Sequence, residues 1–329
     1  TRQGAILSPS FANVFLQPLL TTLDNSGAGA YMFQHHVPAV CYADDLHLLT
    51  TNVVHLGRLL DLVGEFAGKW RLEFVHPNAE KTKSHCVVFG GQLMAGSPSR
   101  VLSNQQLVNK TQSEHLGVLL DSRMSAASHV DQRIKRARAA FYALAPVGMF
   151  AKGLCPADKA YLWKMVVLPV LTFGCSTSLL SAADVERLDK LQATCVKTAF
   201  GLPRSAHHSA LLAASGIHTV QEELRATIFR TFRSAMRSQH RLQQVMLTSL
   251  AKLALCPEEL EGSFVIHVSD LCNSDFCAVM ELAAGCPVNQ DRVRPPRMPD
   301  GLVDTLKFLL QESSEASRRL VRLLTCHYL

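Results

Sequence analysis

The spacing of apolar residues changes near Asp121, and this change narrows the folds that the chain can adopt. Before that residue, short apolar runs alternate with helical stretches, whereas after it apolar residues recur every three or four positions over long segments. The stripe of Val130, Ile134, Ala137 and Phe141 shows the second pattern. The sequence therefore predicts an α+β fold, with an antiparallel sheet and packed helices first and an all-helical region after them.

In the first part, turn-forming residues separate the expected helices and strands. Ser8 is a candidate N-cap with Pro9 at the first helical position, and Thr51 or Asn52 caps a second helix. Between these helices, the apolar run 37–50 is interrupted only by two aspartates, which favours two strands joined by an Asp-Asp turn. The expected elements are a helix over 10–23, these two strands, a helix ending near Trp70, and strands over 71–75, 84–89 and 115–121.

The second part is expected to be helical up to about residue 254 and again over residues 301–326. The segment 165–183 contains no charged residue, but it includes Pro169, Gly174 and several hydroxyl side chains. These residues favour a buried helix pair over a membrane span. The expected helices are one built on the stripe that begins at Val130, then 156–180, 182–200, 219–254 and 301–326, with an irregular stretch over 255–300.

Charge is distributed unevenly along the chain. The formal net charge is +6, and residues 101–250 hold 18 basic and 9 acidic residues. A polyanion is therefore expected to dock on this middle block. Four basic residues are expected to project away from the apolar stripe of the first long helix: Arg133, Lys135, Arg136 and Arg138. A second basic run, from Arg225 to Arg241, is open to a plainer reading as a solvated helix face.

The ten cysteines show no Cys-x-x-Cys spacing, which favours free thiols over a metal site or a disulfide framework. A zinc cluster is the alternative for one group near the C-terminus, although its spacing fits no common zinc finger. The members of that group are Cys256, His267, Cys272, Cys277 and Cys286.

The pair Asp44-Asp45 is the strongest candidate for chemistry. Two adjacent carboxylates lie between apolar strands, where like charges repel unless a cation lies between them. Mg²⁺ or Mn²⁺ is the natural partner of carboxylate oxygens, and two such ions suit phosphoryl transfer. A solvated turn without a ligand is the plainer alternative.

Four motifs in order resemble the palm of reverse transcriptases. Tyr42-Ala43-Asp44-Asp45 resembles the catalytic hairpin, and Arg2-Gln3-Gly4 followed by Leu7-Ser8-Pro9 resembles the preceding motif. Asn78 with Lys81-Thr82, and His115-Leu116-Gly117-Val118 with Asp121, resemble the two motifs that follow. Downstream, His129-Val130, the segment 168–174, Leu191-Gln192 and Gly201-Leu202-Pro203 are similar to the thumb region of non-LTR, LINE-type retrotransposon reverse transcriptases.

This resemblance implies a role for each matching residue. The implied catalytic residues are Asp44, Asp45 and Lys81, and the two aspartates are also the implied metal ligands for two Mg²⁺ or Mn²⁺ ions. The residues implied to contact template, primer or nucleotide are Arg2, Gln3, Gly4, Tyr42, Ala43, Leu116 and Gly117. The residues implied to bind the nucleic-acid backbone are Arg133, Lys135, Arg136 and Arg138.

The resemblance also implies a domain plan and an activity. It places a partial palm at 1–122, a helical thumb and post-thumb region at 123–218, and a helical region of unassigned role at 219–329. The implied activity is RNA-directed DNA polymerase, with an RNA template, a DNA primer and deoxynucleotides as partners, no membrane, and an intracellular, nuclear location.

One part of the family's metal site has no counterpart in the sequence. Relatives supply another metal-binding Asp from a strand upstream of the Arg2–Gly4 loop, so the chain is expected to be a fragment that is inactive alone. The alternative is a non-catalytic nucleic-acid-binding remnant of a decayed or retained element. A group II intron maturase, suggested by Ala12-Asn13, ranks lower because the helical tail follows the LINE pattern.

Overall fold

The computed structural model describes residues 8–32, 35–43, 45–72, 84–90, 101–102, 105–151, 153–239 and 264–272, together with positions 243, 246, 247, 250 and 279. The chain divides into two compact units. The first comprises 1–113 with 239–249, and the second comprises 114–238 with 250–329. The architecture is the expected α+β arrangement of short antiparallel strand pairs and a helical region.

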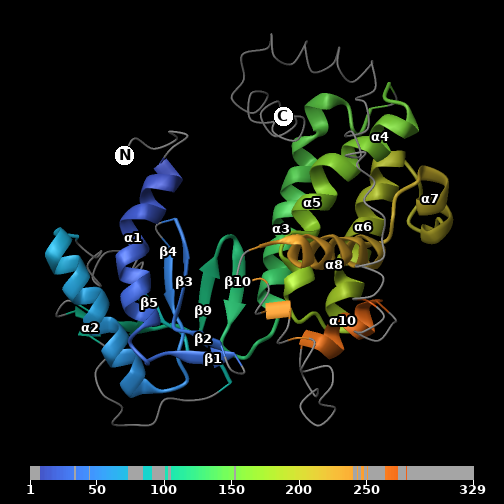
Figure 1. Ribbon diagram of the computed structural model, residues 1–329. Coiled ribbons are helices and arrows are strands. Elements are labelled where there is room, and N and C mark those ends of the chain that lie inside the picture. The colour runs from blue at the N-terminus through green and yellow to red at the C-terminus, as the bar shows by residue number, and fades with distance from the viewer. Residues whose placement is uncertain are drawn as a thin grey trace. The chain divides into compact units, whose positions relative to one another are not determined.

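Two helices form the core of the first unit. Helix α1 (Ser8–Asp24) packs against α2 (Val53–Trp70), as Figure 1 shows. Asn52 caps α2 as predicted, because its side chain accepts a hydrogen bond of 2.8 Å from the Val54 N–H. The buried side chains that join the two helices are Leu19, Leu23, Leu59, Leu60 and Val63. Their burial removes the apolar faces of both helices from water.

Strand pairs surround this helical core. Strands β1 (Ala30–Met32) and β2 (His35–Val37) pair antiparallel, as do β3 (Ala39–Tyr42) and β4 (Asp45–Leu48). Strand β5 (His85–Cys86) pairs parallel with β8 (Val108–Asn109), and β6 (Val101–Leu102) pairs antiparallel with β7 (Gln105–Gln106). The β1–β2 pair was not predicted, and the strand predicted over 84–89 is only two residues long.

The strand predicted over 71–75 does not begin at Arg71. That residue ends α2 in a left-handed conformation, with φ of 53°. Its N–H bonds to the Ala67 and Gly68 carbonyls, which satisfies the end of the helix. Residues 73–75 lie outside the described residues.

The second unit is mainly helical. Strands β9 (Gln112–His115) and β10 (Val118–Asp121) form a hairpin and lead into α3 (Ala127–Ala143). The later elements are α4 (Pro156–Leu162), a π-helix (Trp163–Val167), α5 (Leu168–Thr172), α6 (Ala182–Phe200), α7 (His208–Ser215), α8 (Val220–Arg237) and α10 (Phe264–Cys272), with short 3₁₀ turns at Ala145–Val147 and Cys175–Thr177. Helix α8 crosses α5 and α6 (Figure 1).

Helix boundaries in this unit agree with the sequence where caps define them. Helix α6 covers the predicted 182–200, because Ser181 and Asp184 form a capping box at its start and Gly201 ends it with φ of 67°. Helix α8 stops at Arg237, so the single helix predicted over 219–254 is wrong in extent. The helix predicted over 156–180 contains a π-turn near Pro169 and ends at Thr172.

The segment Pro156–Thr177 is long and apolar enough to cross a membrane by length and composition alone. Within the second unit, however, Leu162, Trp163, Val167 and Leu171 are almost fully buried. These side chains pack against α3 and α6, as expected for the core of a folded domain. The structure therefore supports the buried-helix interpretation of this apolar segment.

Candidate nucleic-acid interface

The hairpin β3–β4 carries the predicted catalytic motif. Its register pairs Ala39 with Leu48 and ends with Tyr42 opposite Asp45. The expected hairpin is therefore present, but Asp45 is the first residue of β4 and not part of the turn. Ala43 follows Tyr42 with φ of 53°, a left-handed conformation that suits tight hairpin turns.

The side chains at the tip of this hairpin are accessible. Tyr42 is 62% exposed, and Asp45 is exposed as well. Among the described residues, Asp45 forms no ion pair. A carboxylate that is exposed and unneutralised suits a hard divalent cation. The described residues contain no group of three or more His, Cys, Asp or Glu side chains placed to hold a metal ion.

Several predicted site residues lie outside the described residues. They are Arg2, Gln3, Gly4, Asp44 and Lys81. Their roles stay predictions, because the arrangement of the complete catalytic set is not part of what the structure describes. The same holds for Cys256, Cys277 and Cys286 of the zinc hypothesis.

The predicted primer-contacting residues Leu116 and Gly117 form the turn of the hairpin β9–β10. A single strand over 115–121 was predicted, and that prediction is wrong. Leu116 and Gly117 have φ of 49° and 82°, so both are left-handed and reverse the chain. Leu116 is 45% exposed at this turn.

Arg133 differs from the expectation that it projects away from the apolar stripe of α3. Its side chain is buried, with 4% exposure, because position 133 lies three residues after Val130 and four before Ala137 on the same helix face. Its Nη2 donates hydrogen bonds to the Gly117 carbonyl at 3.2 Å and to Gln132 Oε1 at 2.9 Å. A direct role of Arg133 on the nucleic-acid backbone is therefore not compatible with its burial.

The other three basic residues of α3 are exposed as predicted: Lys135, Arg136 and Arg138. Arg136 forms an ion pair with Glu114 on β9, with an Nη2–Oε1 distance of 3.4 Å. This pair is solvent-exposed on both sides and contributes little to stability. A phosphate could compete for Arg136 at small cost, which keeps all three residues available to a polyanion.

His129, on the same face of α3 as Arg133, joins three segments. Its Nδ1 accepts a hydrogen bond from the Leu119 N–H at 3.2 Å, which leaves Nε2 to donate to the Phe173 carbonyl at 2.9 Å. Burial lowers the pKa of His129 and so favours the neutral ring that these bonds require. The sequence placed His129 in a motif, but it gave no indication of these contacts.

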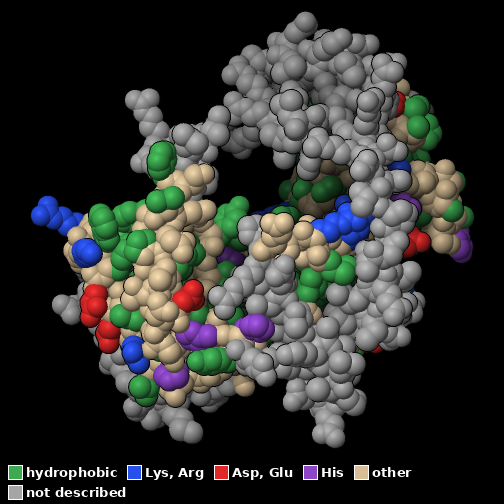
Figure 2. Space-filling model, viewed as in Figure 1, with side chains coloured by type: hydrophobic (Ala, Val, Ile, Leu, Met, Phe, Trp, Pro, Cys, Tyr) green, Lys and Arg blue, Asp and Glu red, His purple; other side chains and the backbone are tan. Residues whose placement is uncertain are grey.

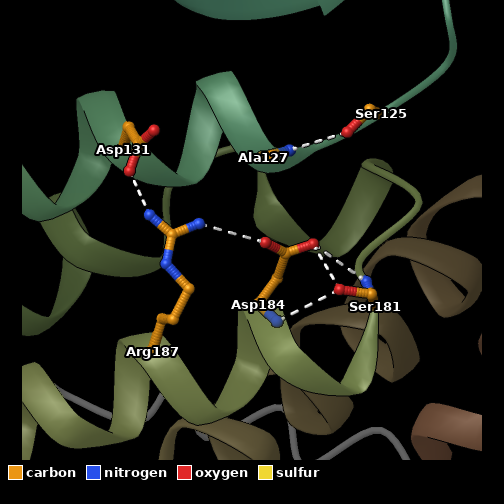
Figure 3. A network of polar contacts seen from close by, with 6 residues as sticks. All are labelled: Ser125, Ala127, Asp131, Ser181, Asp184 and Arg187. Carbon is orange, nitrogen blue, oxygen red and sulfur yellow. Dashed lines mark hydrogen bonds and ion pairs between the residues drawn. The ribbon is translucent and has the colours of Figure 1, made fainter.

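A polar network fixes α6 against α3 in this unit. Arg187 bridges Asp131 on α3 and Asp184 on α6, and Figure 3 shows its guanidinium between the two carboxylates. Asp184 also accepts hydrogen bonds from the N–H and hydroxyl of Ser181, at 3.1 and 2.7 Å. The network holds the helix that carries Lys135, Arg136 and Arg138 in a defined position.

Two arginines of α8 have partners within the second unit. Arg225 Nε donates to the Leu271 carbonyl of α10 at 2.6 Å, and Arg230 pairs with Glu223 at 2.8 Å. Figure 2 shows Lys and Arg side chains gathered over α8 on the visible face. Because Arg225 and Arg230 have partners within the unit, much of this positive charge serves the fold.

Comparison with known proteins identifies the class. Residues 1–120 match the family model for reverse transcriptase (RNA-dependent DNA polymerase). All the predicted catalytic and template–primer residues lie within this matched segment. The first 120 residues therefore resemble a reverse transcriptase in sequence.

A curated relative is a protein of a non-LTR retrotransposon. The chain is 27% identical over 202 residues to the retrovirus-related Pol polyprotein from type-1 retrotransposable element R2 of Popillia japonica. The alignment covers 60% of this chain and 27% of that protein, so the chain spans about a quarter of the relative's length. The predicted resemblance to non-LTR retrotransposon reverse transcriptases is confirmed.

Proposed function

We propose that the protein takes part in RNA-directed DNA synthesis, in which a primer 3′-hydroxyl attacks the α-phosphate of a deoxynucleotide. The main support is the hairpin β3–β4, which presents Asp45, the residue that follows Asp44 in the sequence, as an exposed side chain within the matched segment. Paired carboxylates at a hairpin tip suit nucleotidyl transfer, because a substrate can reach them from solvent while the residues inside the strand pair stay covered.

In this proposal, Asp44 and Asp45 hold two Mg²⁺ or Mn²⁺ ions. The exposed Asp45 carboxylate, which has no ion-pair partner among the described residues, fits such a ligand. When bound, the ions would activate the attacking hydroxyl and neutralise charge on the phosphate. Lys81 would face the nucleotide phosphates and donate a proton to the leaving pyrophosphate.

Contacts with nucleic acid are proposed for each unit separately. Arg2, Gln3, Gly4, Tyr42 and Ala43 would contact the template and the new base pair. The Leu116-Gly117 turn would hold the primer end, and three exposed basic residues of α3 would neutralise backbone phosphates. Those three residues are Lys135, Arg136 and Arg138.

We also infer that the 329-residue chain alone does not polymerise. The resemblance implies a further metal-binding Asp upstream of the Arg2–Gly4 segment, and residues 1–329 do not include that position. The isolated chain would then bind an RNA–DNA duplex through α3 but hold metal weakly, because part of the carboxylate set is missing.

A primer-extension assay with an RNA template, a DNA primer and Mg²⁺ tests both statements. We expect duplex binding by fluorescence anisotropy and no extension product from the isolated chain. Template-dependent synthesis that disappears in Asp44→Asn would establish the polymerase and refute inactivity. Absence of any duplex binding at low salt would contradict the proposed function.

A further inference from the structure

The turn between β9 and β10 is strained and needs support. Leu116 has φ of 49°, and a non-glycine residue in this left-handed region is strained because its Cβ lies too close to the following carbonyl oxygen. Gly117 follows with φ of 82°. Two-residue hairpins favour a turn with both residues left-handed, but leucine is a poor residue for the first of these positions, and here Leu116 is also 45% exposed.

Arg133 supplies that support from beneath the turn. Its Nη2 donates to the Gly117 carbonyl, and its guanidinium carbon lies 5.2 Å from the centroid of the Phe173 ring. Phe173 in turn lies close under the turn, since a Cβ on Gly117 would meet its Cε1 atom at 3.2 Å. The planar guanidinium therefore contacts both the turn and the aromatic ring.

Arg133 has no ion-pair partner within the described part of the chain, although it is only 4% exposed. The nearest influence of opposite charge there is the Glu114 carboxylate, which interacts with Arg133 without forming an ion pair with it. The Nε of Arg133 is buried and has no hydrogen-bond partner among the residues that the structure describes. Buried arginines are ordinarily paired, because an isolated charge in the interior is costly. The arrangement leaves a positive potential directly under an exposed turn, which favours an anionic ligand there.

His129 and Gly174 complete the support. His129 accepts from the Leu119 N–H and donates to the Phe173 carbonyl, so it ties β10 to the segment that carries the aromatic ring. Gly174 allows Val118 and His129 to lie this close to the backbone, because a Cβ on residue 174 would lie 2.7 Å from Val118 Cγ2 and 3.0 Å from His129 Nε2. Helix α3 and the segment 173–174 therefore converge on one hairpin.

We propose that Arg133 is a positioning residue that holds the Leu116-Gly117 turn, and places positive charge beneath it, so that the turn can bind the terminal nucleotide of a primer. This inference rests on the proposed function for the choice of ligand, but the support of the turn can be tested without nucleic acid. Arg133 acts through the turn and need not touch the primer itself.

The experiment compares the 329-residue chain with Arg133→Lys and Arg133→Gln. Arg133→Lys keeps the charge but loses the planar fork and its stacking on Phe173, whereas Arg133→Gln also loses the charge. Arg138→Gln is the matched control, because Arg138 lies on the same helix and is exposed. Circular dichroism and thermal unfolding identify variants that remain folded.

Hydrogen–deuterium exchange of the peptide spanning 116–121 provides the first measurement. We expect exchange about tenfold faster in Arg133→Lys and Arg133→Gln, and no change in Arg138→Gln. Unchanged exchange in both Arg133 variants, while folded, would overturn the positioning role. This result does not depend on the proposed function.

Fluorescence of 2-aminopurine at the primer 3′ end of an RNA–DNA duplex provides the second measurement. In Arg133→Lys, we expect loss of the 2-aminopurine fluorescence change that the wild-type chain produces on binding, while duplex affinity stays within about twofold. In Arg138→Gln, we expect weaker duplex binding but the same fluorescence change once the duplex is bound. A wild-type fluorescence change in Arg133→Lys would overturn the link to the primer end. If the wild-type chain binds no duplex, the proposed function fails, and the exchange measurement alone decides whether Arg133 holds the turn.

Discussion

His129 Nε2 lies 2.9 Å from the backbone carbonyl of Phe173, and the two residues belong to segments that the sequence separates by 44 positions. The hydrogen bond requires a proton on Nε2, because Nδ1 already accepts from the Leu119 N–H. If Nδ1 also carried a proton, it would face the Leu119 N–H as a second donor, and the hydrogen bond between them would be lost. The neutral form of one histidine therefore holds together the hairpin β9–β10, α3 and the end of α5.

Acidification should destabilise the second unit. Burial lowers the pKa of His129, His208 and His267 from the ordinary value of 6.5, so the unfolded chain binds more protons below that pH. Stability is then fully present above pH 6.5 and is lost as the pH falls toward the folded-state pKa values. Thermal unfolding measured from pH 7.5 to 5.5 should show a falling midpoint.

The variant His129→Asn isolates one part of this effect. Asn can accept the Leu119 N–H but does not titrate in this range, so it should cost about 1–2 kcal/mol at pH 7.5 and show a shallower pH dependence. The two remaining buried histidines account for the residual slope. A pH dependence equal to that of the wild type would show that His129 does not contribute.

Gly174→Ala should destabilise the protein strongly. The residue has φ of 72°, and an added Cβ would lie 2.7 Å from Val118 Cγ2 and 3.0 Å from His129 Nε2. Backbone strain and the clash together should cost about 2–4 kcal/mol, measured by urea denaturation. Gly153→Ala is the control, since nothing lies within 4 Å of its Cβ position and it should change stability little.

The structure shows which features could be derived from the sequence. Helices α2 and α6 follow from a periodic apolar stripe together with the caps Asn52 and Ser181. The hairpin β3–β4 follows from two apolar runs around an acidic pair. Such local signals fix an element's type and ends without reference to the rest of the fold.

Other features depend on contacts that a local pattern does not contain. The turn at Leu116-Gly117 interrupts an apolar run, and the close approach of Phe173 to Gly117 is a contact between distant segments that the run itself does not contain. Arg133 is buried because the Gly117 carbonyl and the Phe173 ring receive its guanidinium. A charged residue on a helix is expected at the surface unless distant segments supply such partners.

The network between α3 and α6 should have one strong member and one weak member. Asp184 has a side chain that is 9% exposed, and it caps α6 through Ser181, so Asp184→Ala should cost about 1–2 kcal/mol. Arg187→Met removes the ion pair with Asp131, in which the Arg187 side chain is 38% exposed and the Asp131 side chain 54% exposed. This variant should therefore cost about 0.5 kcal/mol. Urea denaturation of both variants checks the order, and an equal or larger loss for Arg187→Met would contradict it.

The exposed basic residues of α3 should act additively on duplex binding. Lys135→Gln and Arg138→Gln each remove one positive charge from a solvent-facing position without loss of a core contact. If each contacts one phosphate, the slope of log affinity against log salt concentration should fall by about 0.9 per variant, through reduced counterion release.

Fluorescence anisotropy with an RNA–DNA duplex, titrated at several salt concentrations, measures these slopes. Lys190→Gln serves as the control, because Lys190 is 70% exposed on α6 and pairs with Glu186 at 2.8 Å. It removes the same charge from a different helix, so its slope should equal that of the wild type. Equal decreases in all three variants would mean that overall charge attracts the duplex and that α3 is not a specific binding surface.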